Sequence, residues 1–180
     1  MYRDNSLVPI ETVRIAALGA LATKPRTYGQ IAADVRLFTS RIVGPSLDLM
    51  GISIELLRAE GVVESLAEDA GQKDPRLTLT PAGHEMLLKL LKAPNRSPNT
   101  EVSRLVVALK MRFLHLLAPA ERQEQVALLR ALTLAERQRY VELEEQSDGA
   151  NLFKDWLALQ IQLLDTRLAW LDGFAKRCGG

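Results

Sequence analysis

The chain has 180 residues, of which 47% are hydrophobic, and its 23 Lys+Arg and 22 Asp+Glu give a formal net charge of +1. This composition suffices for one sizeable core or two small ones and lacks the charge bias of disordered proteins. The near-neutral balance argues against a general polyanion binder, so any basic surface must be local.

Cys178 is the single cysteine, which excludes a disulfide within the chain and favours a reducing compartment. The N-terminal segment carries Asp4 and Glu11 in or near its apolar stretch, unlike a signal peptide or a membrane span. We therefore expect a cytoplasmic protein with no membrane partner.

Three short helices are predicted in the first third of the chain. Apolar residues at helical spacing predict one helix over residues 8–22 and a second over 28–36. The third is predicted over residues 46–60, after the Gly44-Pro45 break, and Gly61 should end it in a left-handed conformation.

A hairpin follows these helices. Two β-rich runs, "VVESLA" and "RLTLT", flank a polar loop that contains Gly71 and Pro75, as in an antiparallel pair with an exposed loop. The next helix should begin with Thr80 as N-cap and Pro81 in its first turn. This order of elements predicts a winged helix-turn-helix over roughly residues 8–92.

The second half is predicted to be helical. Residues 92–100 contain two prolines and two asparagines and are typical of a linker. One helix is predicted from Val102 to Leu116, and another from Pro119 to about Gln146, either continuous or broken at the capping-box spacing of Thr133. A turn at 147–151 precedes a last helix over residues 152–177. The predicted fold class is mainly α (α+β), with an N-terminal winged helix-turn-helix domain (1–93) and a C-terminal helical dimerisation domain (94–180).

The last helix has an unusually wide apolar surface. One stripe has heptad spacing, and a second stripe lies on a neighbouring face with Trp156, Leu159, Leu163, Trp170 and Phe174. Two packing partners would use this width, the protein's own helices and a second subunit; a central helix in a monomeric bundle is the alternative. The residues predicted to form the dimer interface are those of the heptad stripe, namely Leu157, Ile161, Leu164, Leu168 and Leu171.

Several motifs, in order along the chain, resemble the PadR family of bacterial transcriptional regulators. "ALGALATKPRTYGQIAADV" is similar to the first two helices of that family, and "IELLRAEGVVESL" to the end of its third helix. "RLTLTPAGHEML" resembles its second wing strand and threonine-proline-alanine-glycine turn, and "DTRLAWL" its dimerisation helix. The resemblance implies a dimeric DNA-binding regulator, a repressor in our interpretation, and it permits a response to small aromatic molecules.

The candidate DNA-binding residues combine phosphate anchors with base-reading groups. The predicted third helix carries a net charge of minus two, from Asp48, Glu55, Arg58 and Glu60, so it needs anchoring from elsewhere. The full candidate set is Arg26, Tyr28, Arg36, Arg41, Ser53, Glu55, Lys73 and Arg76. For any one of these side chains, a solvated surface charge is the competing interpretation.

Signs of catalysis or metal binding are lacking in the sequence. His84 and His115 lie in different halves with no carboxylate or cysteine cluster at ligand spacing, and no phosphate loop or serine elbow occurs. We expect no enzyme activity, no cofactor and no metal. An aromatic effector would need an apolar cavity, for which Phe113, Trp156 and Trp170 are the candidates, although aromatic residues at helical spacing more often fill cores.

Two functional hypotheses remain at this point. The first is a homodimeric regulator that docks two winged modules on a pseudo-palindromic site in double-stranded DNA. The second is a winged-helix module that binds another protein through its acidic third helix and has lost DNA binding.

Overall fold

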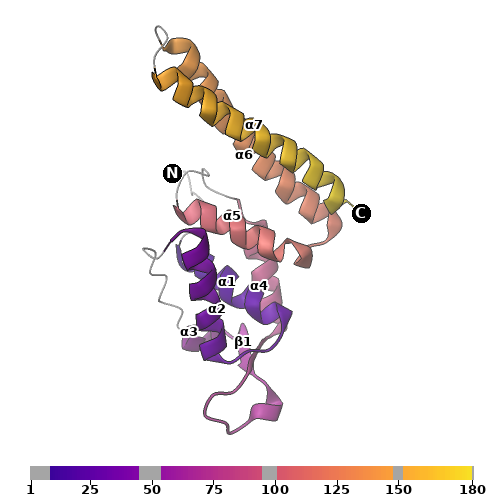
Figure 1. The fold of residues 1–180 in the computed structure, drawn as a ribbon. Coiled ribbons are helices and arrows are strands. Elements are labelled where there is room, and N and C mark those ends of the chain that lie inside the picture. The colour runs from indigo at the N-terminus through magenta and orange to yellow at the C-terminus, as the bar shows by residue number, and fades with distance from the viewer. Residues whose placement is uncertain (1–8, 45–53, 95–100, 148–151, 180) are drawn as a thin grey trace, which may run out of the picture. The chain divides into compact units, whose positions relative to one another are not determined.

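The computed structural model describes residues 9–44, 54–94, 101–147 and 152–179. The chain forms two compact units, Met1–Leu117 and Ala118–Gly180 (Figure 1). In the described part, the first unit contains α1 (Pro9–Thr23), α2 (Tyr28–Ile42), α3 (Ile54–Ala59), β1 (Val63–Ser65), η1 (Ala67–Asp69), β2 (Leu77–Leu79), α4 (Pro81–Lys92), α5 (Glu101–Phe113) and η2 (Leu114–Leu116). The second contains α6 (Pro119–Gln146) and α7 (Leu152–Cys178).

Helix α1 is the centre of the first unit. Ile15, Ala17 and Leu18 are completely buried, and so is Thr12. A helix that is apolar around most of its circumference is stable only when neighbours surround it. Helices α2, α4 and α5 and strand β2 all contact α1, which makes it the core element of the winged helix-turn-helix.

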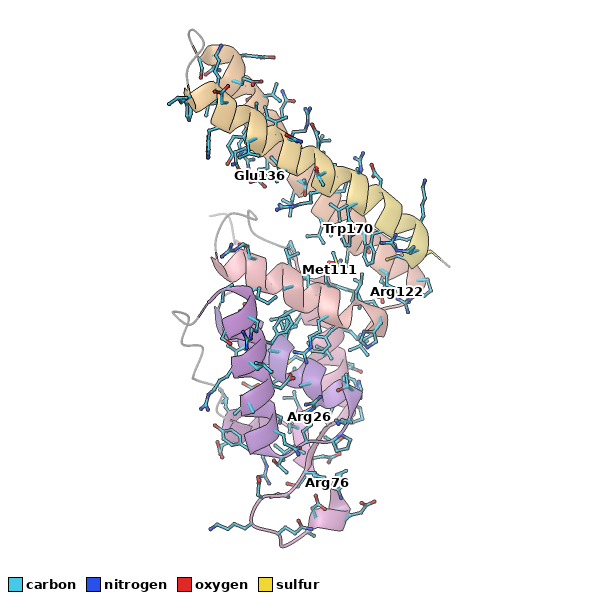
Figure 2. All side chains as sticks on the ribbon, viewed as in Figure 1. Arg26, Arg76, Met111, Arg122, Glu136 and Trp170 are labelled. Carbon is cyan, nitrogen blue, oxygen red and sulfur yellow. The ribbon has the colours of Figure 1, made fainter. Side chains whose placement is uncertain are left out.

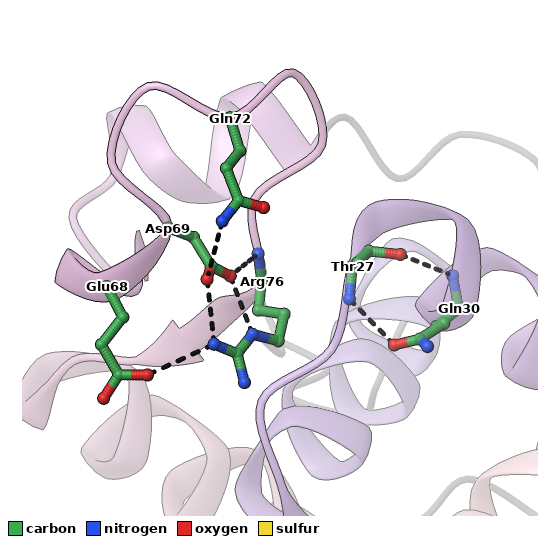
Figure 3. Close-up of polar contacts among 6 residues, drawn as sticks. All are labelled: Thr27, Gln30, Glu68, Asp69, Gln72 and Arg76. Atoms are coloured by element: carbon green, nitrogen blue, oxygen red, sulfur yellow. Dashed lines mark hydrogen bonds and ion pairs between the residues drawn. The ribbon is translucent and has the colours of Figure 1, made fainter.

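Helix α2 begins where the sequence predicted but runs farther. A capping box fixes its start, with the Thr27 hydroxyl accepting from the Gln30 backbone N–H and the Gln30 side chain accepting from the Thr27 N–H (Figure 3). The helix ends at Ile42, six residues after the predicted end at Arg36, because the left-handed Gly44 (φ 88°) is what stops it. Arg41 therefore lies in the last helical turn.

The two predicted strands form the expected antiparallel pair. Val63 pairs with Leu79, and Ser65 with Leu77. Arg26 adds a one-residue bridge, since its backbone exchanges two hydrogen bonds with Leu77, at 3.1 and 2.8 Å. The mainly helical fold with a two-stranded wing is confirmed, and the base of the wing is tied to the junction of α1 and α2.

The junction of β2 and α4 is built as the sequence predicted. Thr80 is the N-cap: its hydroxyl accepts from the Gly83 N–H at 3.1 Å and donates to the carbonyl of Gly61 at 2.7 Å. Gly61 itself is left-handed (φ 71°) and ends the turn after α3. A side chain at Gly83 would put its Cβ closer than 3.0 Å to the backbone carbonyl of Val62, so the first turn of α4 lies directly on the chain that enters β1.

Helix α5 packs within the first unit. Phe113 is 1% exposed and lies against Gly19 of α1, where an added Cβ would approach the ring closer than 3.0 Å. Arg112 donates to both carboxylate oxygens of Asp34 on α2, at 2.9 and 3.0 Å. The compact unit therefore extends past the boundary at 93/94, because the apolar face of α5 completes the burial of α1; the functional division into two domains stays a prediction.

The second unit is an antiparallel helical hairpin. Arg130 pairs with Asp172 and Arg137 with Asp165. Residue numbers along α6 and α7 therefore run in opposite directions, as in an antiparallel pair. Helix α6 is continuous: the Thr133 hydroxyl donates to the carbonyl of Leu129 inside the helix and caps no break. The predicted turn at 147–151 lies, apart from Ser147, outside the described residues.

Candidate nucleic-acid interface

The predicted DNA-binding residues that the structure describes all lie in the first unit. Tyr28, Arg36 and Arg41 are exposed on α2, and Glu55 is exposed at the start of α3. Ser53 lies outside the described residues, as does the part of the predicted third helix that precedes Ile54. Of the remaining three candidates, Arg26 and Arg76 lie at the base of the wing (Figure 2). Lys73 lies in the wing loop, between η1 and β2.

Arg26 is engaged by the protein itself. Its Nε donates to the carbonyl of Ala20, 3.2 Å away in the last turn of α1, and its backbone pairs with Leu77 of β2. A cation at this position also complements the negative end of the α1 dipole. The half-buried Arg26 thus joins the end of α1 to strand β2, a structural role that the sequence alone did not predict.

Arg76 is held more tightly still. Asp69 accepts from the Arg76 backbone N–H at 2.8 Å, from its Nε at 2.8 Å and from an Nη at 2.9 Å, and Glu68 accepts from that Nη at 3.3 Å (Figure 3). The hydrogen bonds from the Arg76 side chain and backbone lower the pKa of Asp69 to about 2, against the desolvation that would raise it. The same carboxylate raises the pKa of Arg76. This is the strongest polar cluster on the wing.

The wing as a whole is acidic. Residues 61–80 contain four carboxylates, Glu64, Glu68, Asp69 and Asp74, against the two basic side chains Lys73 and Arg76. Since Arg76 is paired with two of these carboxylates, Lys73 is the wing cation that makes no ion pair with any described residue. A phosphate that approached the wing would meet mostly repulsive charge.

One basic side chain near the candidate surface was missed by sequence reasoning. Arg58, in the last turn of α3, is exposed and makes no ion pair within the described part of the chain, like Arg41 on α2. Its signal was present, because a basic residue lies two positions before the predicted helix end. Sequence reasoning counted it only toward the charge of the helix.

The heptad stripe of α7 is largely buried within the helical hairpin that α7 forms with α6. Leu157, Leu164 and Leu171 are buried, while Ile161 and Leu168 are half-buried. The second stripe is the open one: Trp156, Leu159, Leu163 and Trp170 are each about half exposed, at 46%, 49%, 55% and 50%. Spacing identified both stripes but not which of them faces α6.

The three candidate ligand-binding aromatics are not gathered within either unit. Phe113 is buried against Gly19 in the first unit. Trp156 stacks on Phe153, and Trp170 stacks on Phe174, one turn away in each case. Fourteen residues separate the two tryptophans, which corresponds to roughly 21 Å along a helix.

The described residues form no further candidate site for a metal ion or a membrane. No group of three or more His, Cys, Asp or Glu side chains that would suit a metal ion occurs within residues 9–44, 54–94, 101–147 and 152–179. Of the described helices, none combines the length and the hydropathy needed to cross a membrane. Cys178 is buried at the end of α7.

Comparison with known proteins places these features in a family. No match to the chain was found among curated proteins. One family model, described as "Putative AphA-like transcriptional regulator", matches residues 2–175 and therefore covers both units. That is a family of regulators, not of enzymes. The chain belongs to the AphA-like family of transcriptional regulators.

Proposed function

We propose that the protein is a homodimeric, PadR-like transcriptional repressor that binds a pseudo-palindromic operator in double-stranded DNA. The observation that carries the proposal is the match of a transcriptional-regulator family over residues 2–175, combined with a wing and helices in winged helix-turn-helix order. Such a protein acts on the chromosome, so the expected location is the bacterial cytoplasm.

Two of the phosphate anchors of this proposal are exposed cations on the helices. Arg41 lies in the last turn of α2 and Arg58 in the last turn of α3, and neither forms an ion pair with a described residue. Such side chains attract DNA without reading its sequence, whereas base edges are read by shorter polar groups on the third helix. Ser53 and Glu55 stay the predicted base-reading residues.

A direct test is binding to a fluorescent duplex that carries the DNA upstream of the protein's own gene, titrated at several salt concentrations against a scrambled duplex. Preference for the native duplex, with affinity that falls steeply as salt rises, would support a DNA-binding regulator. Loss of expression of a reporter under that DNA, on addition of the protein, would support repression.

The open stripe of α7 supports dimerisation. Its two tryptophans lie seven residues to either side of Leu163: in an antiparallel pair of α7 helices centred there, Trp156 of one copy would meet Trp170 of the other. A twofold interface requires this kind of self-complementary pattern.

The dimer is tested with an acid on the stripe and an acid beside it. Leu163→Asp should yield a monomer in sedimentation velocity with unchanged helical circular dichroism, because Leu163 is 55% exposed in the single chain. Gln162→Asp adds the same charge one residue away from the stripe and should stay dimeric. If the Leu163→Asp protein stays dimeric, this stripe is not the dimer interface. Ile161 and Leu168, the half-buried residues of the heptad stripe, are then the next candidates to substitute.

The alternative function is a protein-binding module that has lost DNA binding. The observation that favours it is the wing, in which carboxylates outnumber basic side chains and Arg76 is already paired. The duplex titration discriminates the two, since an interaction module would show no preference for any duplex tested and no effect of Arg41→Gln.

An aromatic effector belongs to the proposal only through the resemblance to PadR regulators. Trp156 and Trp170 are the candidate contacts that are exposed, and their fluorescence reports binding directly. A panel of small aromatic acids that quenches this fluorescence and weakens operator binding would support regulation by such a ligand; quenching without an effect on the operator would count against it.

A further inference from the structure

The wing loop is long for a hairpin and is closed by specific contacts. It spans residues 66–76, between the end of β1 and the start of β2. Loops of this length are ordered only when their own side chains or backbone hold them. Here the Leu66 N–H donates to the carbonyl of Arg76 at 2.8 Å, which joins the two ends of the loop.

Asp69 holds the inside of the loop. It lies in the η1 turn and is 4% exposed, although it is a carboxylate in a surface loop. Its two oxygens accept three hydrogen bonds from Arg76 and one from the Gln72 side chain at 3.3 Å (Figure 3). A buried carboxylate with this many donors is stable only in one arrangement of the loop, because loss of the donors would leave a buried charge unpaired.

Lys73 lies between the two ends of this contact. It follows Asp69 by four residues and precedes Arg76 by three. The left-handed Gly71 (φ 86°) lies between Asp69 and Lys73 and reverses the chain there. The side chain is exposed and forms no ion pair with a described residue. The position of the Lys73 backbone therefore depends on the Asp69–Arg76 pair on either side of it.

We propose that Asp69 and Arg76 are a positioning pair that fixes the wing loop so that Lys73 contacts a DNA phosphate, and that Arg76 itself makes no phosphate contact. The DNA contact in this inference rests on the proposed function. Arg76 is unsuited to the contact role because two carboxylates already pair with its Nε and one Nη, and their negative charge would repel a phosphate at the same guanidinium.

The test is the slope of log Kd against log salt concentration for the full-length protein on its preferred duplex. Each lost phosphate contact lowers this slope by about 0.9 per subunit. Lys73→Gln should lower it by that amount, and Arg76→Gln should do the same, since the loop that presents Lys73 is released. The double variant should lose no more than either single variant, whereas two independent contacts would add to about 1.8 per subunit.

Asp69→Asn separates the two roles of Arg76 by sign. As a positioning residue, Arg76 needs the Asp69 carboxylate, so the substitution should weaken binding and flatten the salt dependence like Lys73→Gln. As a phosphate contact, Arg76 would be liberated, and binding would tighten with a steeper slope. Asp74→Asn is the matched control, because it removes the same charge from the same exposed loop without touching Arg76.

Hydrogen exchange supplies a measurement that does not depend on DNA. Backbone amides of residues 66–77 should exchange faster in Asp69→Asn and Arg76→Gln than in the unchanged protein, while Lys73→Gln should leave them as they are. Unchanged protection in the first two variants would overturn the positioning pair. If no duplex is bound at all, the proposed function and the Lys73 contact both fail, and exchange alone decides whether the pair fixes the loop.

Discussion

Replacing Gly19 by alanine should destabilise the first unit, against the usual effect of this change. In a helix interior, alanine is favoured over glycine by about 1 kcal/mol. At Gly19, however, the new methyl would lie closer than 3.0 Å to the buried Phe113 ring, and overpacking of this kind costs up to about 3 kcal/mol. The Arg112 guanidinium lies over the same ring, 5.1 Å from its centroid, and limits how far the ring can move away from the new methyl group. We expect a net loss of about 2 kcal/mol.

Gly173→Ala is the matched control in α7. The nearest atom to its new methyl is a guanidinium nitrogen of Arg177 at 4.0 Å, so only the helix preference remains and a gain of about 1 kcal/mol is expected. Both tryptophans of the chain lie in α7. In urea titrations, tryptophan fluorescence therefore follows the hairpin, while far-ultraviolet circular dichroism follows both units.

A Gly19→Ala protein as stable as the unchanged one, or more stable, would contradict the predicted clash. Phe113 would then not lie on Gly19, and α5 would not be part of the core around α1. Adding Phe113→Leu to Gly19→Ala should restore part of the loss if the clash is the cause. In an otherwise unchanged chain, Phe113→Leu alone should be destabilising.

Three further outcomes follow from single side chains. Thr80→Ala should lower stability by about 1 kcal/mol, measured by urea unfolding, because the N-cap of α4 is lost. Burial lowers the pKa of Lys110 to about 8, so between pH 8 and about 10.5 the unfolded chain holds a proton that the folded one has released. Stability should rise across that window by up to about 3 kcal/mol, and Lys110→Met should abolish the rise. The pKa of Asp69 is lowered to about 2 from 3.8, so its contribution is complete above pH 4 and is lost as the pH falls through 2; Asp69→Asn should lack this acid dependence in thermal melts.

Local signals predicted the element boundaries that depend on neighbouring residues. Thr80 and Pro81 start α4, Gly61 follows α3 and Tyr28 starts α2, as their caps and breaks indicate. The end of α2 was missed because the relevant signal, the left-handed Gly44, lies eight residues beyond the predicted end. A stop residue is informative only when the pattern before it is known to continue.

The candidate site was less predictable, because charge in a sequence does not reveal its partner. From the sequence, Arg76 is interpreted as a surface cation, whereas in the structure it is hydrogen-bonded to Asp69. No periodicity links two loop residues that are seven positions apart, so the sequence did not predict this pair. Arg26 is likewise engaged by Ala20 and Leu77 through contacts that depend on the completed wing. One of the two basic side chains of the wing is neutralised in this way, and the composition does not show it.

The two stripes of α7 illustrate a different limit. Heptad spacing showed that Leu157, Leu164 and Leu171 share a face, and they do. Spacing alone does not state whether that face meets α6 or a second molecule, because both neighbours favour the same residues. Only the exposure of Leu159 and Leu163 in the folded hairpin separates the alternatives.

The glycine of the threonine-proline-alanine-glycine turn has a consequence for how related chains are recognised. Gly83 is required because the carbonyl of Val62 occupies the space of a side chain, a demand set by the backbone and independent of any bound molecule. In a saturation-mutagenesis library selected only for folding, Gly83 should tolerate almost no replacement, whereas Gly29, where an added Cβ would meet only the Thr27 hydroxyl at 3.9 Å, should accept many. Two regulators that share this turn have therefore inherited or rediscovered the same way to join a strand to a helix. The turn therefore identifies the fold. The residues that select the DNA site of each regulator lie elsewhere in its sequence.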